Sequence, residues 1–152
     1  GDVQAANSIM SWTEANLAIR SDALLAWRWL PADSAGVPDM NNASDGDLFY
    51  AWALVLRGSR DGNPEMMDRA RAIATDLVAR CVVKAPDGSG RQVLLPAAQG
   101  FARDGKFVVN LSYYMPLAMR DVARATGASA LTSCAADGLA IMRDLAARQF
   151  GL

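Results

Sequence analysis

The sequence predicts an all-α fold with one small β-hairpin, as part of a larger helical assembly. In the segments 3–17, 66–81 and 131–145, apolar residues recur at three- and four-residue steps, which is the period of an amphipathic helix. One turn-rich stretch separates two short apolar runs, as expected of a hairpin. Residues 48–56, Leu-Phe-Tyr-Ala-Trp-Ala-Leu-Val-Leu, are apolar nearly all round, and such a helix needs neighbours on every side.

Composition and charge narrow the class of protein. The chain has 152 residues, of which 52% are hydrophobic, so we expect a single domain over 1–152 with a sizeable core. Fifteen basic residues against sixteen acidic ones give no electrostatic footprint for nucleic acid. No apolar run approaches the roughly 20 residues of a membrane-spanning helix, so we expect no membrane insertion. Without histidine, Ser-His-Asp and Cys-His nucleophile systems and most zinc sites are excluded.

The first two predicted helices are separated by a long loop. Residues 3–19 place apolar side chains on one helical face. Residues 21–42 contain tryptophans, prolines and a glycine without a period, which indicates a loop. Helix resumes over 45–57, and Gly58 is then the expected end signal.

A third helix leads into the predicted hairpin. Asn63-Pro64 combines a cap residue with a proline at the first helical position, which predicts a helix from there to about Arg80. Short strands are predicted at 82–84 and 92–95. The stretch between them, Pro-Asp-Gly-Ser-Gly at 86–90, has turn chemistry.

The remaining chain is predicted to be a loop followed by two helices. The loop covers 96–109, and the helices cover 113–126 and 129–149. Gly127 separates the two helices and is a typical helix-ending residue.

The densest functional signal is the polar stretch 41–47, Asn-Asn-Ala-Ser-Asp-Gly-Asp, directly before the most apolar helix. Ser44 or Asp45 could cap this helix. Asp45 and Asp47 fall at its N-terminus, where free N–H groups and the macrodipole favour negative charge. This position predicts lowered pKa values and ionised carboxylates near neutral pH. Such carboxylates can hold sugar hydroxyls, support a developing positive charge, act as a base or bind a cation. Helix capping alone is the competing interpretation.

Other reactive side chains are scarce. Glu14 and Glu65 are the only glutamates among fourteen aspartates, so acid–base chemistry would rest mainly on aspartate. Cys81 and Cys134 lack the spacing of metal ligands. Two buried free thiols are favoured over a disulfide.

Several motifs resemble one enzyme family. The stretch 43–54, Ala-Ser-Asp-Gly-Asp-Leu-Phe-Tyr-Ala-Trp-Ala-Leu, resembles the signature of glycoside hydrolase family 8, in which Ala-Ser/Thr-Asp-Gly/Ala-Asp opens an apolar helix. Further motifs resemble the family in the same order, at 12–17, 26–29, 93–96, 100–101 and 110–114. The resemblance covers essentially the whole chain and is strongest to the endoglucanases that accompany bacterial cellulose synthesis.

The resemblance implies a fold, an activity and a class of substrate. The family forms an (α/α)6 toroid with a cleft across one end, so these residues would be part of such a toroid. Its members cleave β-1,4-linked glucan, mixed-linkage glucan, xylan or chitosan with inversion. We therefore expect an endo-β-1,4-glucanase (a cellulase) that needs no metal or organic cofactor. A non-catalytic β-glucan-binding domain and a helical interaction scaffold are the alternatives.

The resemblance also implies site residues. Asp45 carries over as the catalytic carboxylate that holds the sugar beside the cut and stabilises charge. Tyr113 would reach the same subsite, with Asn110 and Ser112 shaping its loop. The other expected substrate contacts are Trp27, Trp29, Asn42 and Asp47, and for Asp47 a purely supporting role is the competing interpretation.

Two pairs of aromatic residues can be interpreted further from spacing. Trp27 and Trp29 alternate across Arg28, so an extended loop would place both on one face. This agrees with the platforms for glucose rings that the resemblance implies. Two core aromatics are the alternative. Tyr113 and Tyr114 are adjacent at a helix start and point differently, so one is expected at the site and one in the core.

Two expected catalytic groups have no counterpart here. An inverting glycosidase needs an acid and a base roughly 6.5–9.5 Å apart. The family's acid is a glutamate in a Ser-Glu-Gly-Gln-type motif, and neither Glu14 nor Glu65 fits it. Its base is an aspartate in a Pro-Pro-Asp-Trp-type segment beyond the last helix. We therefore expect a trimmed portion that is inactive alone.

The parent enzyme is expected in the periplasm or outside the cell, because its polymer lies there, although no signal segment is visible. Its partners would be β-1,4-glucan and the cellulose synthesis machinery. Exposed apolar faces of an open toroid would also favour self-association.

Overall fold

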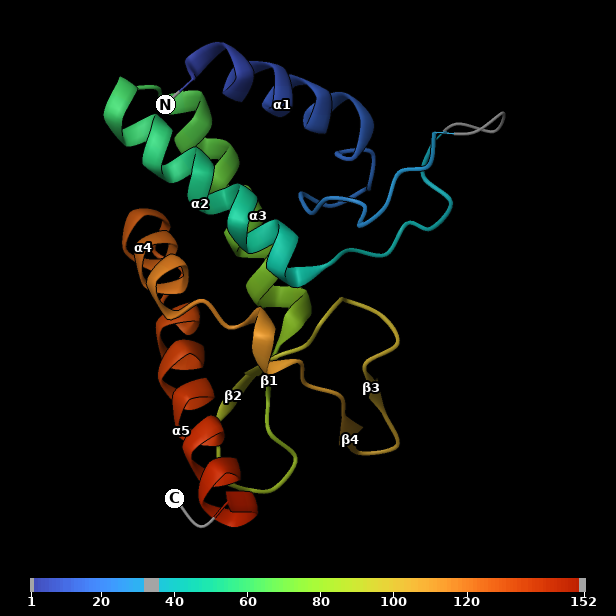
Figure 1. Ribbon diagram of the computed structural model, residues 1–152, viewed down its shortest axis with the longest axis vertical. Helices are drawn as coiled ribbons and strands as arrows, with labels where there is room; N and C mark the ends of the chain where they lie inside the picture. The colour runs from blue at the N-terminus through green and yellow to red at the C-terminus, as the bar shows by residue number, and fades with distance from the viewer. Residues whose placement is uncertain (1, 32–35, 151–152) are drawn as a thin grey trace.

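The computed structural model describes residues 2–31 and 36–150 (Figure 1). Its helices are α1 (Val3–Asn16), α2 (Ser44–Asp61), α3 (Pro64–Cys81), α4 (Pro116–Thr126) and α5 (Ala130–Phe150). Two antiparallel hairpins pair β1 (Val82–Lys84) with β2 (Gln92–Leu94), and β3 (Ala102–Arg103) with β4 (Lys106–Phe107). A short 3-10 helix, η1 (Leu111–Tyr113), precedes α4. The predicted all-α architecture is confirmed.

The helices form two adjacent pairs. α2 and α3 run antiparallel around a short turn at Gly62 and Asn63, and α4 and α5 form the second pair (Figure 1). α2 also packs on α4, and α5 packs on the β1–β2 hairpin. The loop between α1 and α2 and the β3–β4 hairpin lie on the side away from α4 and α5 (Figure 1). This loop side carries most of the predicted site residues.

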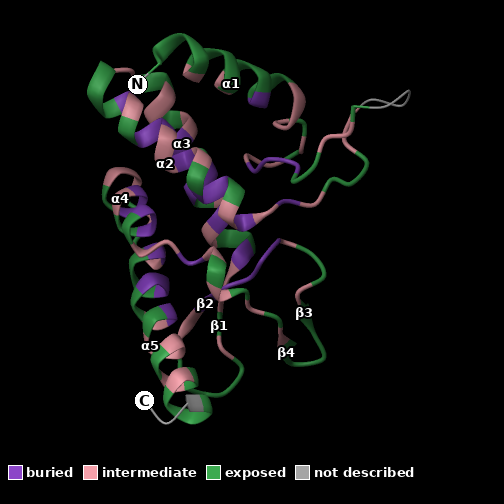
Figure 2. Cartoon of the chain, in the orientation of Figure 1, coloured by how far each residue is buried: buried purple, intermediate pink, exposed green. Residues whose placement is uncertain are grey.

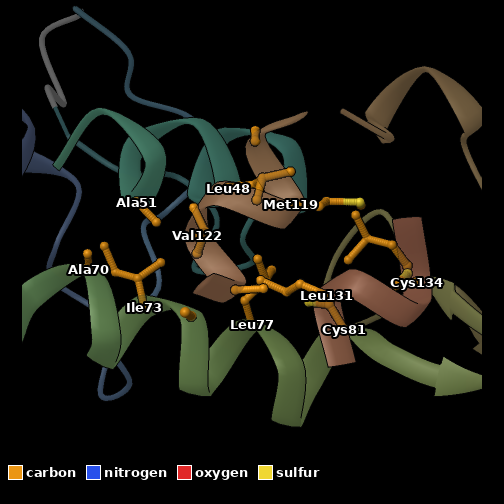
Figure 3. Packing of buried hydrophobic residues seen from close by; sticks show 14 of the residues in the cluster. Leu48, Ala51, Ala70, Ile73, Leu77, Cys81, Met119, Val122, Leu131 and Cys134 are labelled. Carbon is orange, nitrogen blue, oxygen red and sulfur yellow. The ribbon is translucent and has the colours of Figure 1, made fainter. Parts of the chain in front are cut away.

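The hydrophobic core lies where α2, α3, α4 and α5 meet. Leu48, Leu77, Val122 and Leu131, one from each helix, have no exposed surface and point into this core (Figure 3). Each such side chain contributes about 1.5–3 kcal/mol when it is fully buried. The apolar period read from the sequence therefore corresponds to the packed faces of these four helices.

The apolar surface is only partly covered. α1 buries only Thr13 among its described side chains, and its exposed residues dominate the helix in Figure 2. On α2, Phe49 and Leu56 are exposed to 42% and 52% even though both are large and apolar. This pattern agrees with helices that pack on further elements in a complete toroid.

Two helix ends differ from the prediction. α1 ends at Asn16 rather than at 19, because the Leu17 carbonyl accepts the N–H of Ala26 (2.9 Å) and leaves the helical pattern. α2 continues past Gly58 to Asp61, and Gly62 ends it with a left-handed φ of 62°. Gly58 instead gives α3 room, since a Cβ there would lie 3.0 Å from the Met67 sulfur.

The start of α2 is capped differently from the prediction. Ala43 is the cap position and makes no side-chain hydrogen bond. The Ser44 N–H instead donates to the Pro96 carbonyl (2.9 Å) from the loop after β2. This bond fastens the start of α2 to the loop that follows the hairpin.

The predicted helix at 113–126 begins later than expected. Tyr113 belongs to η1, and α4 starts at Pro116. Proline disfavours helical backbone at the residue before it, and Met115 is accordingly non-helical. The cap of η1 is Asn110, whose side chain accepts the Ser112 N–H.

A second hairpin lies inside the predicted loop 96–109. Asp104 and Gly105 form its two-residue turn with φ values of 52° and 71°. An Asp-Gly pair at such values is a typical hairpin turn. The dipeptide was therefore a usable signal, although the strands it joins are only two residues long.

Both cysteines are buried free thiols, as predicted. Desolvation raises the pKa of Cys81 to about 11 and that of Cys134 to about 12. Both therefore stay protonated at neutral pH and act as small apolar side chains.

The adjacent tyrosines have different environments. Tyr114 is buried, and its hydroxyl accepts the N–H of Leu94 (2.7 Å) on β2. Its ring lies directly against Gly138 of α5, where an added Cβ would come within 2.2 Å of a ring carbon. Tyr113 is half-buried and packs against the edge of the core. The two adjacent tyrosines thus differ in burial, as the sequence indicated.

Candidate functional site

Several predicted site residues line one pocket on the loop side of the molecule. This Trp27–Tyr113 pocket has a volume of about 240 Å³. It is built by the loop before α2, the loop after β2 and η1. Its lining includes Trp27, Asp39, Asn41, Pro96, Phe101 and Tyr113. Aromatic faces beside a few polar groups are typical of a small-molecule or sugar site.

Trp27 is the most exposed aromatic residue of this pocket. The backbone of Trp27 is fixed, because its N–H donates to the Asn41 carbonyl (3.0 Å). The indole Nε1–H donates to Asp39 Oδ2 (2.9 Å). The residue nevertheless remains 48% exposed. Because the indole N–H is already hydrogen-bonded and the ring is fixed, its apolar face is available to a ligand.

The structure separates the two predicted platform tryptophans. Trp29 does not belong to the lining of the Trp27–Tyr113 pocket. Its ring packs edge-on against Trp12 of α1, with centroids 5.5 Å apart and planes at 80°. This contact ties the loop to α1, so the alternation across Arg28 does not bring both rings into one pocket.

Tyr113 enters the pocket from η1, and Asn110 shapes that turn. The Asn110 Oδ1 accepts both the Ser112 N–H (3.1 Å) and the Ser112 hydroxyl (2.8 Å). The two residues therefore fix the short helix that presents Tyr113, as the motif suggested.

Asp45 lies in the first turn of α2, next to the pocket. Its Oδ1 accepts the N–H of Gly46 (2.8 Å), which leaves its other oxygen without a protein partner among the described residues. Ala43, two positions earlier, belongs to the pocket lining, whereas Asp45 does not. Asp45 is thus half-buried and lies two positions after a residue of the pocket lining.

Asn42, which belongs to the pocket lining, forms a buried pair with Asp47, which does not. Asp47 is 1% exposed, and its two oxygens accept the Leu25 N–H (2.7 Å) and the Asn42 Nδ2–H (2.8 Å). The Asn42 Oδ1 accepts the N–H of Ala98 (2.7 Å). The pair therefore connects the Trp27 loop, the start of α2 and the loop after β2, which are the three segments nearest the site.

A larger hollow of about 400 Å³ lies elsewhere, between α1 and α2. Val3, Ala6, Met10 and Leu56 line it, toward the end of α2 opposite Asp45. Because it is mainly apolar and remote from the motif residues, we place the candidate site at the smaller pocket.

Comparison with known proteins identifies the family of the chain. The model of the family "Glycosyl hydrolases family 8" matches residues 1–152. The chain belongs to glycosyl hydrolase family 8.

Relatives and solved structures give the same result. A probable endoglucanase of Novacetimonas hansenii is 38% identical over 115 residues, which are 76% of this chain and 33% of that protein. The endoglucanase Cel10 of Klebsiella pneumoniae superimposes with a TM-score of 0.86 at 32% identity, over 95% of this chain and 46% of that one. An endo-β-1,4-glucanase of Acetobacter xylinum gives 0.85 at 33% identity, over 94% and 44%. The chain thus spans about a third of the length of its first curated relative and forms part of the family 8 (α/α)6 toroid.

Burial changes the expected acidity of the second aspartate in the family 8 signature. The predicted lowering of its pKa is wrong, because desolvation of Asp47 raises its pKa to about 6. Hydrogen bonds from Leu25 and Asn42 favour the ionised form but do not offset the loss of water. A position at a helix start alone therefore does not decide the acidity of a fully buried group.

This raised pKa predicts a pH-dependent stability. The folded chain holds the Asp47 proton more tightly than the unfolded chain, so this group contributes most at low pH and its contribution is lost as pH rises through about 6. Since one pKa unit corresponds to about 1.4 kcal/mol, the free energy of unfolding should fall by roughly 3 kcal/mol between pH 3 and 7 through this group. Urea unfolding of the wild type and of Asp47→Asn at several pH values measures this change in the free energy of unfolding. Parallel pH curves for the two proteins would contradict the prediction.

The two glutamates lie outside the pocket. Glu14 Oε1 accepts hydrogen bonds from the Tyr50 hydroxyl (2.9 Å) and the Arg69 Nε (2.8 Å). Glu65 is exposed in the first turn of α3. Neither belongs to the lining of the Trp27–Tyr113 pocket.

Sequence reasoning did not single out Asp39 or Asn41 as site residues. Both line the pocket and contact Trp27. Asp39 follows a proline in an irregular loop, where aspartate is common for turn formation, so no local pattern separated it from other loop residues.

The described residues contain neither a metal-binding cluster nor a membrane-spanning helix. Over 2–31 and 36–150, no three His, Cys, Asp or Glu side chains gather in a way that could hold a metal ion. Within the same ranges, no helix combines the length and hydropathy needed to cross a bilayer.

Proposed function

We propose that these residues form the sugar-binding portion of an endo-β-1,4-glucanase that cleaves internal bonds of cellulose with inversion. The observation that carries this proposal is the fixed, half-exposed indole of Trp27 in one pocket with Tyr113, beside the helix start that bears Asp45. The family 8 relatives of the chain, which include endoglucanases, support it.

The pocket chemistry suits a neutral glucan. The ring of a β-linked glucose has apolar C–H faces and equatorial hydroxyls, which match an aromatic surface with polar groups at its edge. Chitosan would need free carboxylates for its amino groups. Among the described residues of the lining, Asp39 is the one carboxylate, and it already accepts from the Trp27 indole and from the Asn41 N–H (2.9 Å).

In the proposed mechanism, Asp45 and Tyr113 bind the sugar next to the scissile bond. The free oxygen of Asp45 would hold a hydroxyl and stabilise the positive charge that develops on the ring. Asn42 and Asp47 would keep the start of α2 in place, and Asn110 and Ser112 would keep Tyr113 in place. Trp29 would support the loop through Trp12.

We assign the proton donor and the base to segments outside residues 1–152. Glu14 accepts hydrogen bonds from Tyr50 and Arg69, and Asp47 is buried and hydrogen-bonded, so neither carboxyl group suits these roles. General acid and general base catalysis are each worth about 10²–10⁴ in rate, so the chain alone should bind glucan without measurable turnover. Reducing-end release from carboxymethyl cellulose by the chain alone would contradict this assignment.

Binding of cellopentaose by the chain tests the sugar site. Trp27→Ala removes the exposed indole, so the association constant measured by calorimetry should fall about tenfold or more. Trp52→Phe is the matched control, because the Trp52 indole donates to Asp121 (3.1 Å) on α4, away from the pocket. If Trp27→Ala binds cellopentaose as tightly as the wild type, the sugar site does not include Trp27. If the wild type does not bind cellopentaose, the proposed function is refuted.

We also propose that the enzyme acts in the periplasm or outside the cell, where β-glucan is found. In that setting it would work beside a cellulose synthesis machinery, as its strongest motif resemblance suggests.

A further inference from the structure

The segment 39–41 holds Trp27 at two points. Asp39 Oδ2 accepts the indole Nε1–H (2.9 Å), and the Asn41 carbonyl accepts the Trp27 backbone N–H (3.0 Å). The two acceptors are linked to each other, because Asp39 Oδ1 accepts the Asn41 N–H (2.9 Å). The Asn41 side chain is fixed in turn, since its Nδ2 donates to the Gln99 carbonyl (3.0 Å). We call Asp39, Asn41 and these bonds the indole clamp.

We propose that Asp39 is a positioning residue for the sugar platform, which sets the orientation of the Trp27 indole in the pocket and acts on the glucan through that ring. The proposal rests on the proposed function, because it assigns the glucan platform to Trp27. An exposed tryptophan without such a bond would sample several rotamers, and binding would then have to fix the ring. The clamp fixes it before the sugar arrives.

The carboxylate suits this task better than a neutral group. Each of its two oxygens receives one N–H donor, and an amide could accept only one of them. Hydrogen bonds from Asn41 and Trp27 hold the pKa of Asp39 below its ordinary value, so the acceptor stays ionised at neutral pH. Asp39→Asn is therefore nearly isosteric but places an NH₂ group against one of the two donors.

A double-mutant cycle separates positioning from direct contact. Cellopentaose affinity is measured for the wild type, Trp27→Ala, Asp39→Asn and the double variant. Asp39→Asn alone should weaken binding about three- to tenfold, and it should change affinity by less than about twofold when Trp27 is already alanine. An equal loss in both backgrounds would overturn the proposal, because Asp39 would then contact the sugar or support the fold independently. Asp68→Asn, on the exposed side of α3, removes the same charge and is the matched control.

A second measurement needs no sugar. In a ¹H–¹⁵N spectrum the indole signal of Trp27, assigned from its loss in Trp27→Ala, should shift and exchange faster with solvent in Asp39→Asn. An unchanged indole signal would overturn the proposal. If the wild type does not bind cellopentaose, the proposed function fails, while this spectrum still decides whether Asp39 holds the ring.

Discussion

Asp45→Asn is expected to lower the turnover of carboxymethyl cellulose about 10²–10³-fold in a longer family 8 polypeptide that carries these residues, with a much smaller change in KM. The variant keeps the size of the side chain and removes the charge beside the sugar. Because that charge is needed most when the ring becomes positive, the loss should fall on kcat. Reducing-end assays over a range of substrate concentrations measure both constants.

The matched control for Asp45→Asn is Asp68→Asn, which makes the same substitution on the exposed side of α3. It should leave both constants unchanged. A loss in Asp45→Asn that appears only in KM would assign this carboxylate to ground-state binding and would contradict its charge-stabilising role.

Asn42→Ala is expected to destabilise the folded chain by about 3–5 kcal/mol, which is a large part of the roughly 5–15 kcal/mol of a typical domain. The substitution leaves the buried Asp47 carboxylate without its side-chain donor and the Ala98 N–H without its acceptor. The Leu25 N–H still donates to the other oxygen, but the loss of one of two donors to a buried charge is costly, because neither water nor another group replaces it. Urea unfolding at neutral pH measures the effect.

Two further variants test the cause of this loss. Asn7→Ala makes the same change at an exposed position on α1 and should alter stability by less than about 0.5 kcal/mol. The double variant Asn42→Ala/Asp47→Ala removes both partners and should be less destabilising than the sum of the two single variants. Full additivity would show that the two side chains do not act as a pair.

Local signals predicted most of the fold. Asn63 and Pro64 fixed the start of α3, and Gly127 marked the end of α4, because cap residues act through the nearest backbone groups. Gly58 was misinterpreted for a physical reason. Its missing side chain serves the packing of α3 rather than a helix end, and packing between helices is not visible in a local pattern.

The candidate site was predictable only where a motif carried it. The Asp-Gly-Asp and Asn-Leu-Ser-Tyr stretches indicated Asp45 and Tyr113, and the tryptophan loop indicated Trp27. The function of Asp39 depends on a bond to a side chain twelve positions earlier, in a loop without a period. The acidity of Asp47 depends on how completely the folded chain excludes water from it. Both are tertiary properties, so spacing could not supply them.

The contact between Tyr114 and Gly138 has a consequence for how family 8 sequences can vary. The ring occupies the volume that any side chain at 138 would need. The two positions are therefore expected to change together during evolution: a lineage that keeps tyrosine at 114 is restricted to glycine at 138, although alanine is the better helix former. A lineage with a smaller residue at 114 regains that freedom and loses the hydroxyl that ties β2 to the turn presenting Tyr113. Covariation of two residues outside the pocket lining would thus record a constraint that the candidate site places on α5.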